Sequence, residues 1–134
     1  MTASNDNADA HPLTQHTITV SRTARYFVHG ALDANTTDVW ISLHGYAQLA
    51  ASFAQTAHWP SAPHRAFVFP EALQRFYDSD YRTPGANANA PVVASWMTRE
   101  ARDADIADNN AYLEAVWADV RAASADAALT VLGF

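Results

Sequence analysis

Three short apolar runs lie along the chain, each bounded by polar or turn-forming residues. They span residues 39–43, 65–69 and 128–132. Runs of four to eight mostly apolar residues are typical of strands that are covered on both faces of a sheet. We therefore predict three buried strands, of which the first has the clearest pattern.

Two segments between these runs have helical periodicity. The first, about residues 47–57, carries apolar residues on one face and ends before Pro60. The second runs for about 25 residues to Ala123, with Thr98 as its predicted N-cap and acidic residues in its first turn. Its apolar face recurs at steps of three and four, through Ile106, Asn110, Leu113, Val116, Trp117 and Val120. We expect this face, Trp117 included, to pack on the sheet.

The remaining segments have weaker patterns. Residues 1–14 are polar, and we predict a disordered tail. Residues 17–20 alternate and are β-branched, and residues 26–28 follow after a short polar link, so the pair predicts an antiparallel hairpin. Residues 71–97 have no sustained hydrophobic periodicity, so we expect a long irregular segment. Such segments in a compact domain commonly have a functional role.

The order of these elements indicates the fold class. An N-terminal β-hairpin followed by parallel strands with crossover helices predicts an α/β fold, with one domain over residues 15–134. The carboxyl ends of parallel strands meet at one rim of a sheet. Three segments should therefore converge there: His44-Gly45-Tyr46, Pro70-Glu71 and Gly133-Phe134.

The His44-Gly45 turn is the main candidate for chemistry, because open parallel sheets bind ligands at this rim. Gly45 allows a sharp turn and the close approach of a ligand. The free N–H groups of the helical turn that follows can face a negatively charged oxygen, so the stretch indicates an oxyanion site. A metal site of His44 with His58 or His64 is an alternative, but an ordinary turn or supporting histidine is the favoured interpretation.

Acidic residues offer two further candidates. Glu71 on the rim is a possible catalytic acid, although a lone carboxylate without an evident partner is better interpreted as a hydrogen-bonding or solvated group. Asp103, Asp105 and Asp108 are interpreted as a solvated helix face, because the glycine and glutamate of an EF-hand loop are absent.

Composition narrows the class of partner and the location. The net charge is −6 and the eight Arg residues form no basic stripe, which argues against a nucleic-acid partner. The chain has no Cys, so it has no disulfide and no thiolate chemistry. The polar N-terminus is neither a signal peptide nor a membrane span. We expect a cytoplasmic protein without integral membrane association.

Four motifs carry a resemblance to a known family. They are Leu43-His44-Gly45-Tyr46 with Gln48-Leu49, then Phe67-Val68-Phe69-Pro70-Glu71, Ser95-Trp96-Met97-Thr98-Arg99-Glu100, and Val131-Leu132-Gly133-Phe134. In this order, the chain resembles the N-terminal portion of a serine esterase of the phospholipase/carboxylesterase family, which has the α/β-hydrolase fold. In that family the last motif continues into the nucleophile serine of a G-x-S-x-G elbow. The resemblance covers roughly residues 25–134.

The resemblance implies acyl transfer on small-molecule esters through a serine nucleophile, with no cofactor and no metal. The serine, the acid and the histidine base would all lie beyond Phe134, so none of them is expected in this chain. The backbone N–H of Tyr46 would be one oxyanion donor, with His44 and Gly45 supporting the loop. Glu71, Trp96 and Met97 would line the substrate pocket, although Trp96 and Met97 are equally well explained as a cover for the sheet.

The sequence is also compatible with two other classes of function. One is a small-molecule-binding α/β domain without catalysis, although the four glycines have no phosphate-loop spacing. Another is a truncated pseudoenzyme. If the chain ends at Phe134, we expect one edge of the sheet and part of its apolar face to be exposed, which favours oligomers or poor solubility. The sequence does not indicate a particular oligomeric state.

Overall fold

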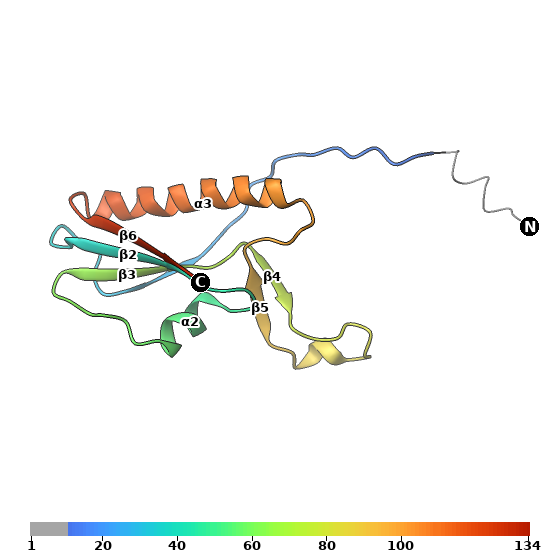
Figure 1. Cartoon of the computed structure of the whole chain (residues 1–134), viewed down its shortest axis with the longest axis horizontal. Helices are drawn as coiled ribbons and strands as arrows, with labels where there is room; N and C mark the ends of the chain where they lie inside the picture. The colour runs from blue at the N-terminus through green and yellow to red at the C-terminus, as the bar shows by residue number, and fades with distance from the viewer. Residues whose placement is uncertain (1–10) are drawn as a thin grey trace, which may run out of the picture.

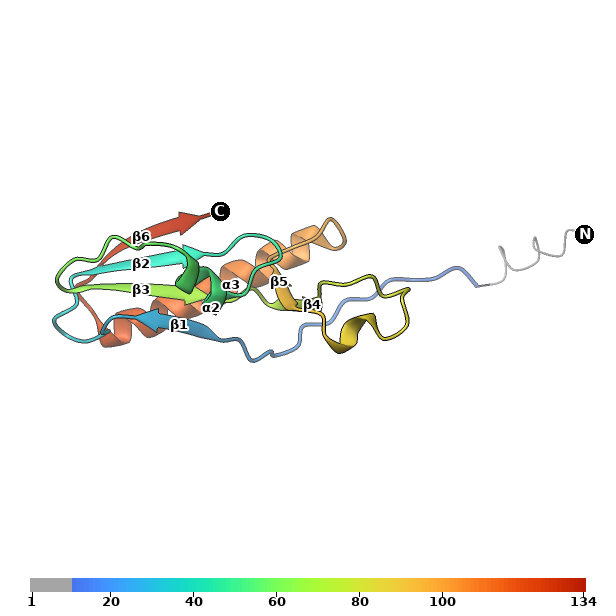
Figure 2. The same ribbon diagram turned by 90° about the horizontal axis from the view of Figure 1, so that it is seen from below.

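The computed structural model describes residues 11–134, which form a mixed four-stranded sheet, a separate two-stranded hairpin and two α-helices (Figure 1). The sheet has the order β1-β3-β2-β6, and its strands lie side by side in Figure 2. Their bounds are Tyr26–His29 for β1, Asp38–Leu43 for β2, Arg65–Pro70 for β3 and Ala128–Gly133 for β6. β2 pairs in parallel with β3 on one side and β6 on the other.

The two helices cover opposite faces of this sheet (Figure 1). Helix α3, Arg102–Ala123, packs Val116 and Val120 against Val39, Ile41 and Val68. Helix α2, Ala50–Thr56, packs its apolar face against aromatic side chains that alternate with those residues. This second cluster contains Ala50, Phe53, Phe67 and Phe69, with Trp40 and Trp59 beside it. Strand periodicity therefore gives each face of the sheet its own apolar layer.

The predicted N-terminal hairpin is wrong. β1 pairs antiparallel with β3, from Tyr26 opposite Pro70 to His29 opposite Phe67. Residues 17–20 form no strand and lie exposed. Pairing with β3 lets β1 add apolar side chains to both faces of the core, which an isolated two-stranded hairpin cannot do. The predicted tail is outside the described residues up to residue 10, and residues 11–14 have neither helix nor strand.

The segment 71–97 is more regular than predicted. It contains β4, Gln74–Tyr77, and β5, Val92–Ser95, which pair antiparallel, with a short 3₁₀-helix, Ala86–Ala88, between them. In Figure 1 this hairpin projects beyond the end of the main sheet. Four-residue strands separated by a long loop leave too short an alternation to recognise in the sequence.

Both helices begin later than predicted. α2 begins at Ala50 instead of residue 47, because Ala47 has a left-handed backbone with φ of 60°. α3 begins at Arg102, and Thr98 is not its N-cap: the Thr98 hydroxyl instead accepts a hydrogen bond from the Glu100 N–H at 3.1 Å. The C-terminal end at Ala123 is confirmed.

β6 is an edge strand of the described sheet instead of the buried strand predicted. Most of its side chains are exposed, including Leu129 and Val131. Its pairing with β2 is nevertheless continuous from Ala128 opposite Asp38 to Gly133 opposite Leu43. The position of the strand was therefore predicted correctly, and its burial was not.

Candidate functional site

The three predicted segments do converge at the carboxyl ends of β2, β3 and β6. The Ala72 N–H, just after β3, donates to Nε2 of His44 at 3.0 Å. A Cβ placed on Gly45 would lie 4.0 Å from Cβ of Phe134. The rim is therefore a continuous surface made from segments that are up to 90 residues apart in the sequence.

His44 is a buried supporting residue of this rim. Its Nε2 accepts the Ala72 N–H, so its Nδ1 carries the proton and donates to the Gly45 carbonyl oxygen at 2.8 Å. Both ring nitrogens are thereby used in holding the loop. This arrangement favours the interpretation of His44 as a turn histidine over a metal ligand or a base.

Trp96 holds the same loop from the other side. Its indole Nε1–H donates to the His44 carbonyl oxygen at 2.8 Å. The centroids of the indole ring and the His44 imidazole are 5.1 Å apart. The carbonyl of Trp96 in turn accepts a hydrogen bond from Nδ2 of Asn109 in α3, also at 2.8 Å. A chain of contacts therefore connects α3 to the loop that follows β2.

The sharp turn of the loop lies at Ala47 and not at Gly45. Gly45 has no positive φ, but its N–H donates to Oε1 of Gln48 at 2.6 Å, and a Cβ on Gly45 would lie 3.1 Å from that oxygen. Space, more than backbone freedom, therefore favours glycine at position 45. Ala47 adopts the left-handed conformation and donates its N–H to the Ala94 carbonyl at 3.0 Å.

Tyr46 lies between these anchored residues. Its backbone N–H has no hydrogen-bond acceptor within residues 11–134, although the N–H groups of Gly45 and Ala47 on either side are both bonded. Tyr46 as a whole residue is 69% exposed. A rigid loop that presents one free N–H at a sheet rim is suited to bind a carbonyl or carboxylate oxygen.

Glu71 is buried, and both of its carboxylate oxygens accept hydrogen bonds. Its carboxylate accepts hydrogen bonds from Arg25 at 2.6 and 3.2 Å, from Arg75 at 3.4 Å and from the Ala50 N–H at the start of α2 at 3.3 Å. Burial opposes ionisation, but the hydrogen bonds and charge of Arg25 outweigh it, so the pKa of Glu71 is lowered. Glu71 thus connects the segment just before β1 with α2 and β4, and it has the structural role of an ion-paired helix cap.

The other proposed pocket residue, Met97, follows β5 and is partly exposed. Its carbonyl accepts a hydrogen bond from the hydroxyl of Ser95 at 2.9 Å. Trp96 lines a cavity between residues 19–26 and α3, to which neither Met97 nor Glu71 contributes. The structure therefore places the three residues in three different environments.

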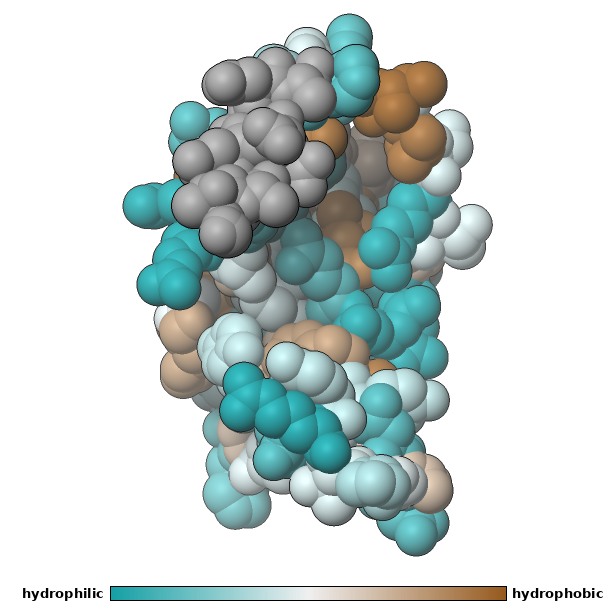
Figure 3. All heavy atoms as spheres, turned by 90° about the vertical axis from the view of Figure 1, so that its right-hand side faces the viewer, coloured by the Kyte–Doolittle hydropathy of each residue, from teal (hydrophilic) through white to brown (hydrophobic). Residues whose placement is uncertain are grey.

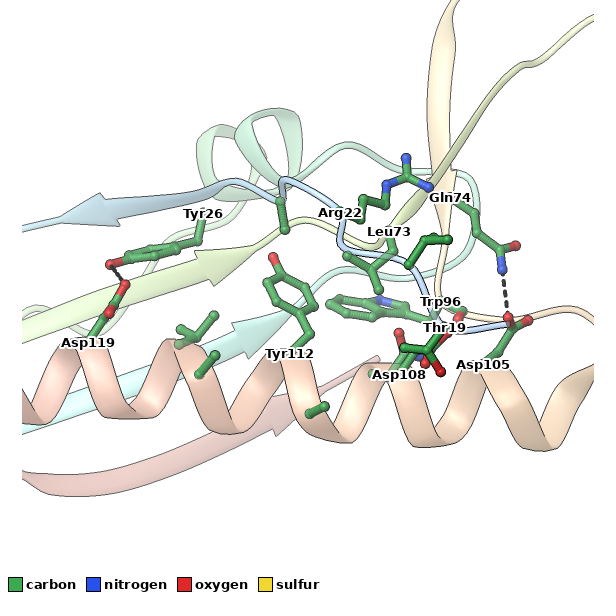
Figure 4. A pocket seen from close by; sticks show the side chains of 16 residues that line it. Thr19, Arg22, Tyr26, Leu73, Gln74, Trp96, Asp105, Asp108, Tyr112 and Asp119 are labelled. Carbon is green, nitrogen blue, oxygen red and sulfur yellow. Dashed lines mark hydrogen bonds between the residues drawn. The ribbon is translucent and has the colours of Figure 1, made fainter. Parts of the chain in front are cut away.

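A cavity of about 590 Å³ lies between residues 19–26 and α3 (Figure 4). Its aromatic walls are Tyr26, Trp96 and Tyr112, and Asp105, Asp108 and Asp119 contribute carboxylates from α3. Burial raises the pKa of Tyr112 to about 12, and its hydroxyl donates to the Glu71 carbonyl at 2.9 Å. Sequence reasoning missed this cavity because one wall is an irregular segment, which has no periodic signal.

Figure 3 shows the end of the molecule that carries the hairpin, where apolar residues lie among hydrophilic ones without forming a single continuous patch. Within residues 11–134, no group of three or more His, Asp or Glu side chains is placed to hold a metal ion. No helix in the same range is both long and apolar enough to cross a bilayer.

Compared with known proteins, the chain matches no family model, no curated protein and no solved structure.

Proposed function

We propose that the rim around Tyr46 is the oxyanion-binding part of an acyl-transfer site, in a cytoplasmic serine ester hydrolase of the phospholipase/carboxylesterase type. The observation that carries this proposal is the free backbone N–H of Tyr46, at the carboxyl end of the central strand, on a loop anchored by His44, Gln48 and Trp96.

The role of this donor follows from the chemistry of ester hydrolysis. When a nucleophile attacks the ester carbonyl, the oxygen becomes an oxyanion, and a fixed N–H stabilises that charge without reorganisation. One such donor contributes about 3–4 kcal/mol to transition-state stabilisation. Hydrogen bonds around His44 keep the loop in place, so the donor is pre-organised before substrate binds.

None of the serines on the neighbouring strands is proposed as the nucleophile. Ser42 and Ser95 are both buried within strands, and the Ser95 hydroxyl donates to the Met97 carbonyl. In this proposal the serine, acid and base belong to sequence after Phe134. The 134-residue polypeptide then binds the carbonyl oxygen but does not turn over an ester.

The test is to extend the polypeptide with the sequence encoded after Phe134. We expect the extended protein to hydrolyse short p-nitrophenyl esters and to react with a fluorophosphonate probe, and we expect no turnover from residues 1–134. Changing the predicted nucleophile serine to alanine is the matched control. An extended protein without a reactive serine would refute the proposal, and so would turnover by residues 1–134 that survives rigorous purification.

A second candidate function is small-molecule binding without catalysis, and the cavity beside α3 favours it. Its volume of about 590 Å³ is in the range of ligand-binding sites, and it combines aromatic walls with a few polar groups. A ligand of this cavity should raise the melting temperature of the protein. Ala111→Trp would fill the cavity and should abolish that increase.

A further inference from the structure

Two exposed aromatic rings pack on each other beside the free N–H of Tyr46. The ring of Tyr46 lies 5.9 Å from that of Phe76, measured between centroids, with an angle of 36° between the planes. Tyr46 belongs to the loop after β2, whereas Phe76 comes from β4, thirty residues later. Such a pair offers adjoining apolar ring surface that a flat apolar group can cover.

The position of Phe76 relative to the Tyr46 N–H is fixed by backbone contacts. The Ala47 N–H donates to the Ala94 carbonyl at 3.0 Å, and the Ala94 N–H donates to the Gln48 carbonyl at 2.9 Å. Phe76 lies opposite Val93, the neighbour of Ala94 on β5. β5 therefore pairs with β4 along one edge and bonds the oxyanion loop at Ala94 along the other, which sets Phe76 beside that loop.

The polar and charged side chains near Phe76 on β4 are bonded to other residues of the protein. Side chains alternate along β4, so Arg75 and Tyr77 face away from Phe76, and Arg75 contacts Glu71 at 3.4 Å. On the same face as Phe76, the amide of Gln74 is bonded to Asp105 at 2.9 Å. The ligand group that fits this surface is therefore apolar and uncharged, and a flat ring matches two exposed ring surfaces best.

We infer that Phe76 is a specificity-determining residue, which with Tyr46 binds an aryl group attached to the carbonyl that the Tyr46 N–H contacts. This inference rests on the proposed function and names its substrate class, esters with an aromatic group next to the reacting carbonyl. The N–H holds the carbonyl oxygen, and the two rings hold the aryl group. Phe76 takes no part in the chemical step.

The test is an NMR titration of residues 1–134 with benzoate and with acetate. The two carboxylates carry the same charge and differ only in the aryl group, so the net charge of the protein affects both equally. We expect benzoate to bind about threefold to tenfold more tightly than acetate, in line with the contribution of one aromatic contact. Phe76→Ala should remove this preference, Phe76→Leu should retain part of it, and Tyr77→Ala, on the opposite face of β4, should leave it unchanged.

The amide signals of Val93 and Ala94 report whether the hairpin remains folded in each variant. Equal affinities for the two carboxylates, or a benzoate preference that Phe76→Ala leaves intact in a folded hairpin, would overturn the inference. The amide signal of Tyr46 tests the proposed function separately. If it responds to both carboxylates without a benzoate preference, the oxyanion site stands and the aryl site does not; if it responds to neither, the proposed function itself fails.

Discussion

His44 is buried to 1% exposure and makes two hydrogen bonds, although histidine at a ligand-binding rim is commonly associated with catalysis. In this protein the role of His44 is structural, since its side chain connects the ends of β2 and β3. The same holds for Glu71, whose carboxylate joins three segments of the chain. At the level of single residues, the polar groups of the rim therefore mainly hold the Tyr46 loop.

Replacement of His44 by alanine tests this role. We expect His44→Ala to lower the free energy of unfolding by about 2–4 kcal/mol, because it leaves a cavity and removes the acceptor of the buried Ala72 N–H. Urea denaturation measures the change. The exposed residue His58 is the control, and His58→Ala should change stability by less than about 0.5 kcal/mol. A similar small effect at position 44 would contradict the structural role.

The ion pairs of Glu71 predict how stability depends on pH. The folded-state pKa is lowered below its ordinary value of 4.5, so the carboxylate contributes stability above pH 4.5, and this contribution is lost as the pH falls through the lowered pKa. We expect Glu71→Gln to be about 1–3 kcal/mol less stable than the wild type at pH 7, a range that allows for solvent around the half-exposed Arg25.

The difference between Glu71→Gln and the wild type should then narrow as the pH is lowered below 4.5, which urea denaturation at a series of pH values can follow. Glu114→Gln, at an exposed position on α3, is the control for a general charge effect. A difference that stays constant between pH 7 and pH 3 would show that ionisation of Glu71 does not contribute.

At the level of elements, α3 connects the apolar core to the candidate site. Its face was predicted to contain Asn110, but the buried asparagine is Asn109, whose side chain bonds the Trp96 carbonyl. The periodicity of Val116 and Val120 defined the direction of the face correctly. It could not identify which of two adjacent asparagines has a partner, because that partner comes from the β4–β5 hairpin region.

These adjacent asparagines form a matched pair of substitutions. Asn109→Ala should lower the free energy of unfolding by about 1–2 kcal/mol, because it leaves the Trp96 carbonyl without its donor. Asn110→Ala should change it by about 0.5 kcal/mol or less. Both substitutions have the same effect on helix propensity, so the difference between them, measured by thermal or urea unfolding, isolates the buried contact. Equal effects would mean that the contact contributes little.

At the level of the whole molecule, apolar surface remains exposed along β6. Leu129, Val131 and Phe134 are 40%, 59% and 74% exposed, and the strand contains no charged residue or proline. An uncharged edge of this kind is a template for pairing with other chains. It also borders a groove of about 320 Å³ between α3 and β6, which is lined by Leu113, Trp117 and Val131.

We therefore expect the polypeptide of residues 1–134 to self-associate as its concentration rises, which sedimentation velocity can measure. Val131→Lys should shift the protein toward monomer, because a charge on the edge strand opposes pairing. Ala118→Lys adds the same charge at an exposed position on α3, away from both edges of the sheet, and should have little effect. A protein that is monomeric at every concentration would contradict this prediction.

Several features of the molecule could be read from local patterns. The apolar runs located β2, β3 and β6, and the periodicity of Val116 and Val120 located the packed face of α3. Turn residues after these runs were enough to predict that three segments meet at one rim. Such signals depend on neighbours within one or two turns of a helix or a few residues of a strand, so they are present in the sequence itself.

The features that the sequence did not predict all depend on contacts between residues that are far apart in the sequence. β1 pairs with β3 across about 40 positions, Glu71 meets Arg25 across 46 positions, and Trp96 bonds the His44 carbonyl across 52. Phe76 reaches Tyr46 through a hairpin whose strands have four residues each. The energy of these contacts appears only when the chain has folded, so the local pattern placed the rim, and packing between distant segments assigned a role to each of its residues.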